Sequence, residues 1–139
     1  MSNQENQKAN EKPDLPETFI QGSGSAVQGR ISALLAGLHQ ISPRDNPEAY
    51  AGAQFNLGVV YNDQNKPEKA IAAWSKVRHS DDPEAHAGAQ FNLGVVYNDQ
   101  NKPEKAIAAW SKVRHSDDPE AHAGAQFNLG VVYNDQNKP

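Results

Sequence analysis

A block of seventeen residues, AGAQFNLGVVYNDQNKP, occurs at 51–67 and returns unchanged at 87–103 and 123–139. The copies are 36 residues apart, and from Pro47 onward they differ only where Tyr50 is replaced by His86 and His122. A period of this length is typical of a solenoid, in which each repeat is one supersecondary unit that packs on its neighbours. The sequence therefore predicts a stack of similar units.

Each repeat begins with a segment of helical periodicity, residues 47–64 in the first copy. A proline opens it, directly after Asn46, or after Asp82 and Asp118 in the later copies, and such side chains are good N-caps. Its apolar side chains recur on a single helix face, at Ala53, Leu57, Val60 and Tyr61. We call this predicted element the A helix.

A second helical segment follows at residues 66–80, and we call it the B helix. Its apolar stripe consists of Ala70, Ile71, Trp74 and Val77. The polar turn NDQNK that separates it from the A helix is short, so the two helices are expected to be antiparallel neighbours.

These motifs resemble the tetratricopeptide repeat. Leu57, Gly58 and Tyr61 form L-G-x-x-Y, and Ala70 and Trp74 follow at the spacings of the family signature. The resemblance covers residues 47–139, about two-thirds of the chain. It implies an all-α fold, a right-handed solenoid of antiparallel helix pairs.

The chain departs from the family pattern at a few positions. Gln54 stands where a large aromatic residue is usual, with Phe55 one place later, and Val77 stands where a small residue is usual. The unit is also longer than the common 34 residues, and the excess lies around HSDDP, after the B helix. Sel1-like repeats share the longer period but carry the extra residues between the two helices, so they fit less well.

The repeats divide the chain into five parts. Residues 1–24 have few apolar side chains and are predicted to be a disordered tail and linker. A shift of 36 residues aligns residues 25–42 with a B helix, so 25–46 is predicted to be a diverged half-repeat. Two full repeats, 47–82 and 83–118, and a final A helix in 119–139 follow.

Composition excludes several classes of function. The net charge of −4 gives no basic surface for nucleic acid, and no run of eighteen apolar residues predicts a membrane span. No signal peptide precedes the repeats, and cysteine is absent, so a cytoplasmic location is expected. Identical units produce rows of like groups rather than one catalytic centre, so the chain is not expected to be an enzyme.

Histidine and aspartate recur at each junction between repeats. His79 and His86 flank Asp81 and Asp82, but this spacing matches no known ligand pattern, and the aspartates are explained as helix caps. The short GSGS segment is too isolated to predict a phosphate loop. No metal and no cofactor are therefore expected.

The resemblance also implies an interaction site, because A helices of the family line a concave groove that holds a peptide or a partner helix. Lysine and arginine of the carboxylate clamp are missing, since Gly124 and Asn128 occupy the required places. An alternative is that Phe55 packs between adjacent A helices and the asparagines only solvate the surface. By position, the groove residues are Phe55, Asn56, Val59, Asn62, Phe91, Asn92, Val95, Asn98, Phe127, Asn128 and Val131.

A second hypothesis is self-assembly, because the predicted order begins with a B helix and ends with an A helix. The last A helix of one chain would then dock beside the first helix of another, head to tail or by swapped stacking. The open alternatives are that the array continues in a longer protein or that the last helix frays. The residues predicted for self-association are Leu34, Leu38, Leu129, Val132 and Tyr133.

Overall fold

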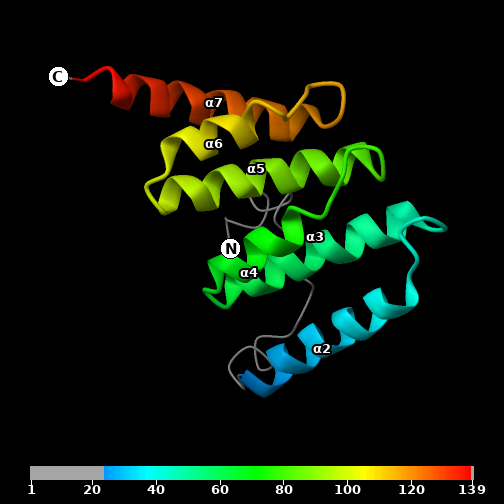
Figure 1. Cartoon of the computed structure of the whole chain (residues 1–139). Coiled ribbons are helices and arrows are strands. Elements are labelled where there is room, and N and C mark those ends of the chain that lie inside the picture. Colours follow the sequence, from blue (N-terminus) through cyan, green and yellow to red (C-terminus); the bar gives the residue numbers. More distant parts are fainter. Residues whose placement is uncertain (1–23, 139) are drawn as a thin grey trace.

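The computed structural model describes residues 24–138, and within this range the chain forms six helices and no strand. Figure 1 shows them stacked from α2 at one end to α7 at the other. The predicted tail lies outside the described residues, except for Gly24, which begins α2. The helices are α2 (Gly24–Gln40), α3 (Pro47–Asp63), α4 (Pro67–Trp74), α5 (Pro83–Asp99), α6 (Pro103–Trp110) and α7 (Pro119–Gln136).

The three A helices, α3, α5 and α7, begin as predicted. The side-chain oxygen of Asp82 accepts hydrogen bonds from the backbone amides of Glu84 and Ala85 at 3.1 and 3.2 Å. Asp118 caps α7 in the same way, and Asn46 caps α3 through the amide of Ala49 at 3.3 Å. The predicted N-caps are therefore confirmed.

An asparagine in the left-handed region reverses the chain after α3 and after α5. Asn65 has a φ of 62° and Asn101 has the same value. The amide of Lys66 donates to the carbonyl of Tyr61, and the amide of Asn65 to that of Asn62, both at 2.9 Å. This is a Schellman motif, which closes the helix end and brings the next helix back beside it.

The B helices, α4 and α6, end earlier than the sequence predicts. The predicted segment runs to residue 80, whereas α4 ends at Trp74. The amides of Lys76 and Val77 then bond three residues back, to Ala73 and Trp74, so the chain tightens into turns. Val77 is nevertheless buried, so the apolar stripe was right although the α-helix stops before it.

Arg78 and Asp81 hold the turn that follows α4. The guanidinium group of Arg78 contacts both carboxylate oxygens of Asp81 at 3.3 Å, and the amide of Asp81 bonds to the Arg78 carbonyl at 3.0 Å. This compact turn leads directly into the cap of α5. If α4 continued to residue 80, Arg78 and Asp81 could not form this turn. The turn therefore accounts for the short B helix.

The helices pack as a solenoid of pairs, as predicted. Helix α3 packs on α4 and α5 packs on α6, each pair joined by its short turn (Figure 1). Each B helix also contacts the A helix that follows, and the A helices α3, α5 and α7 contact one another in sequence. Helix α2 packs on α3 in the place of a preceding B helix.

A tryptophan locks each complete pair. Trp74 is fully buried, and its indole N–H donates to the Phe55 carbonyl of α3 at 3.1 Å. The indole lies directly on Gly58, where any Cβ would overlap the ring. Trp110, Phe91 and Gly94 repeat this arrangement in the next pair. The glycine recurs because it lets the indole approach the helix backbone.

Candidate interaction site

The phenylalanines of the predicted groove join neighbouring A helices. Phe55 of α3 packs on Gly88 of α5, where an added Cβ would lie 3.1 Å from the ring. Phe91 packs on Gly124 of α7 in the same way, at 2.9 Å. Both rings are half-buried, so these two side chains follow the alternative reading, packing between helices. Phe127, in the last A helix, is 71% exposed.

A cavity of about 190 Å³ opens between α5 and α7. About 150 Å³ is enough to hold a benzene ring, so the cavity can accept an aliphatic or aromatic side chain. Its lining comes from α5, α6 and α7, and four of its six residues belong to the predicted groove. The lining residues are Val95, Asn98, Trp110, Asn128, Val131 and Val132.

The remaining predicted groove residues have different environments. Val59 and Asn92 are buried, at 1% and 3% exposure. Asn62 is half-buried, and Asn56 is exposed on α3. The groove residues are therefore brought together at the α5–α7 junction, whereas near α3 most of them are covered.

The residues predicted for self-association also separate into two groups. Leu129 and Val132 are buried against α6 within the chain itself. Leu34 and Leu38 are half-buried against α3, and each keeps part of its side chain exposed. Tyr133 is 48% exposed on α7.

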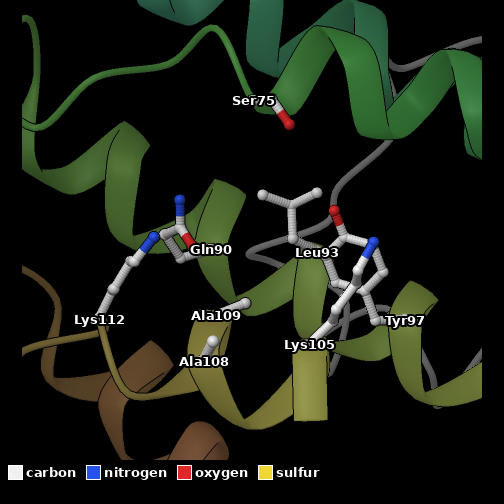
Figure 2. Close-up of a pocket in the computed structure, with 8 residues that line it drawn as sticks. All are labelled: Ser75, Gln90, Leu93, Tyr97, Lys105, Ala108, Ala109 and Lys112. Carbon is white, nitrogen blue, oxygen red and sulfur yellow. The ribbon is translucent and has the colours of Figure 1, made fainter. Parts of the chain in front are cut away.

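A larger cavity, of about 360 Å³, lies on the side of the B helices and was not predicted. It is lined by Ser75, directly after the end of α4, and by residues of α5, of α6 and of the turn after α6. Figure 2 shows Lys105 and Lys112 at its two ends with Leu93 between them. The Lys105 ammonium group lies 5.5 Å from the centroid of the Tyr97 ring, a cation–π contact. Because the sequence did not predict the early end of the B helix, it gave no signal for this cavity.

The junction between the two complete repeats joins histidine to aspartate. His79 Nε2 lies 3.0 Å from Asp117 Oδ2, and Arg114 Nε donates to the same oxygen at 3.2 Å. Although desolvation opposes ionisation, the hydrogen bonds from His79 and Arg114 hold the pKa of Asp117 below its usual range. Among residues 24–138, no three His, Asp or Glu side chains gather in a way that could hold a metal ion.

A family model described as tetratricopeptide repeat matches residues 55–119 and again 91–139, which together span more than half of the chain. The chain belongs to the tetratricopeptide repeat family. No curated protein and no solved structure matches it significantly.

Membership of the tetratricopeptide repeat family sets the general class of function. These repeats are protein-interaction modules, and their fold is not a catalytic one. The described helices of this tetratricopeptide repeat chain include none that is long and apolar enough to cross a membrane. The 36-residue period of the chain is longer than the common unit of the family.

Proposed function

We propose that the chain is a non-enzymatic interaction module that binds a peptide or a helix in the groove of its A helices. The cavity between α5 and α7 carries this proposal, because it combines apolar walls with two asparagine amides. A ligand side chain would enter between Val95 and Val131. Asn98 and Asn128 would bond the ligand backbone beside it.

The lining favours a particular class of ligand. Each asparagine amide offers both donors and an acceptor, which suits a peptide backbone with one N–H and one C=O per residue. No lysine, arginine, aspartate or glutamate lines this cavity, so charge contributes little to recognition. We therefore expect an internal segment with one large apolar side chain rather than a free C-terminal carboxylate.

Several predictions from the sequence belong to the same proposal. The division into a half-repeat at 25–46, repeats at 47–82 and 83–118, and a last A helix in 119–139 describes how the groove would be assembled. The partner is a protein or a peptide, with no nucleic acid, no membrane, no metal and no cofactor. The cytoplasmic location stays a prediction from composition.

A peptide selection followed by titration tests the proposal. A random peptide library displayed on phage is selected against the immobilised chain, and the enriched peptides are titrated by calorimetry. Val131→Asp places a charge in the cavity at a side chain that is 45% exposed, so folding should be preserved. We expect this variant to weaken binding at least about tenfold, which corresponds to about 1.4 kcal/mol.

Lys112→Ala is the matched control, because Lys112 lines the other cavity. Binding that persists in Lys112→Ala and is lost in Val131→Asp supports the A-helix groove. The opposite result would move the site to the outer cavity, and no enriched peptide at all would contradict the proposal.

A further inference from the structure

The last A helix lacks the cover that the same sequence has in α5. In α5, Phe91 packs on the next A helix and Gly94 is covered by Trp110. In α7, Phe127 is 71% exposed, and no atom of residues 24–138 lies within 4 Å of the position of a Cβ at Gly130. Phe127 and Gly130 of α7 therefore lack the packing partners that Phe91 and Gly94 have in α5.

The opposite end of the stack shows the complementary gap. Gly88 and Gly124 each accept a phenylalanine from the preceding A helix, at Phe55 and Phe91. Among the described residues, none has an atom within 4 Å of the Cβ position of Gly52, their equivalent in α3. On this count a phenylalanine of a second copy can reach it.

Helix α2 makes one of the two contacts that a B helix makes inside the stack, the contact with the A helix that follows it. Its buried Ile31, with Leu34 and Leu38 beside it, packs on Leu57 and Val60 of α3. The equivalent face of α5 receives the residues of α4. Inside the stack, however, a B helix also covers the A helix before it, as Trp74 covers Gly58.

The side of α2 that would make this second contact is open. By the 36-residue alignment, Leu38 corresponds to Trp74 and Leu35 to Ile71. Trp74 is completely buried, whereas Leu38 is half-buried and Leu35 is 39% exposed. The chain therefore contains both halves of one A-helix and B-helix interface, at opposite ends of the stack (Figure 1).

We propose that these ends are a docking surface for a second copy of the chain. Helix α7 of one copy takes the place of the A helix before α3 of the next. Phe127 then packs on Gly52 of the second copy, and Leu38 of the second copy covers Gly130. Because the two surfaces differ, the contact is heterologous and builds an open filament or a closed ring.

The second copy is favoured over an unrelated partner because its two ends carry counterparts of the pairs that pack inside the stack. The exposed phenylalanine meets the open glycine, and the exposed leucines meet the other open glycine, with the spacing that the interior repeats already use. Phe127 and Leu35 are large exposed apolar side chains, so burying them favours the contact. This inference is independent of the proposed peptide groove, because neither Gly52 nor Gly130 lines that cavity.

Sedimentation velocity over a wide range of protein concentration tests the proposal. The unmodified chain is expected to grow beyond the monomer as concentration rises. Gly52→Lys and Gly130→Lys each place a long charged side chain in one half of the contact and should keep the chain monomeric. Ala72→Lys is the matched control, because Ala72 is exposed on α4, away from both surfaces, and it should assemble normally.

An equimolar mixture of the two glycine variants gives the sharpest result. Gly52→Lys keeps an intact α7 surface and Gly130→Lys keeps an intact α2 surface, so the mixture should form one-to-one dimers and stop there. Helical circular dichroism equal to that of the unmodified chain shows that each variant is folded. A chain that is monomeric at every concentration would overturn the proposal, and so would dimers of either variant alone, which indicate a symmetric or swapped contact.

Discussion

Helices α5 and α7 have the same first seventeen residues but different surroundings. In α5, Gly88, Asn92 and Gly94 are buried, whereas in α7 Gly124 and Asn128 are half-buried and Gly130 is exposed. The face toward the preceding B helix is the same in both, since Leu93 and Leu129 are both buried. In a solenoid, burial depends on the neighbouring units as much as on the residue itself.

Of the changes predicted here, loss of Trp110 should reduce the free energy of unfolding the most. Trp110 lies on Gly94 of α5 and belongs to the same buried cluster as Ala125 and Leu129 of α7, so it stabilises both helices. Trp110→Ala is expected to reduce the free energy of unfolding by about 3–5 kcal/mol, the usual range for a buried large aromatic residue. Urea denaturation followed by circular dichroism measures the loss.

The fluorescence of Trp74, the one tryptophan left in that variant, reports on the first pair separately. We expect Trp74 to unfold at a higher urea concentration than the helical signal as a whole, since α3 and α4 keep their own contacts. A loss of stability below about 1 kcal/mol would contradict the central packing role of Trp110.

The same glycine substitution should have opposite signs in the two helices. Gly94→Ala pushes a methyl group into the Trp110 indole and is expected to cost about 1–3 kcal/mol, as overpacking does. Gly130→Ala meets open space and improves helix propensity, so stability should rise by up to about 1 kcal/mol. Thermal unfolding of the two variants at low protein concentration decides the matter, and changes of equal sign would contradict the difference in cover.

Removal of a phenylalanine ring sharpens the comparison further. Phe91→Ala removes the half-buried contact with Gly124 and should reduce the unfolding free energy by about 1–2 kcal/mol. Phe127→Ala removes an exposed ring and should change it by less than about 0.5 kcal/mol. Chemical denaturation of both variants under dilute conditions tests this, and similar losses would show that Phe127 is packed within its own chain.

The smallest expected effect is a pH dependence at the junction before α5. Burial of the imidazole, together with the nearby charges of His79, Lys112 and Arg114, lowers the pKa of His86 below its ordinary value of 6.5, although Asp117 opposes the shift. As the pH falls, His86 is therefore protonated in the unfolded chain before it is protonated in the folded chain. Stability from this group is complete above pH 6.5 and is lost as the pH falls below that value.

His86→Tyr, which copies the Tyr50 of the first repeat, should remove part of this dependence. Urea midpoints measured on both sides of pH 6.5 give the slope for each chain. An unchanged slope in the variant would mean that His86 does not contribute.

The sequence was sufficient to predict the order of the helices, because repeated caps, prolines and apolar stripes agree with one another. It was not sufficient to place the end of the B helix. Val77 continues the apolar stripe, but a stripe records which residues are buried and not whether the backbone remains helical. The turn that Arg78 and Asp81 form after α4 decides that end.

The candidate site was less predictable for a related reason. Phe55, Phe91 and Phe127 have the same local sequence, so no local pattern can show that two of them pack on glycines and the third does not. The cavity at Val95 and Val131 depends on the spacing of α5 and α7, which the repeat period alone does not give.

Site-specific cross-linking tests most directly whether the free face of α7 receives α2 of another copy. The chain has no cysteine, so Gly130→Cys and Leu38→Cys introduce single thiols, and a disulfide forms only if their Cα atoms approach within about 7 Å. We predict that an oxidised mixture of the two variants forms the mixed dimer faster than a mixture of Gly130→Cys with the control Ala72→Cys. Equal rates for the two mixtures would contradict head-to-tail docking.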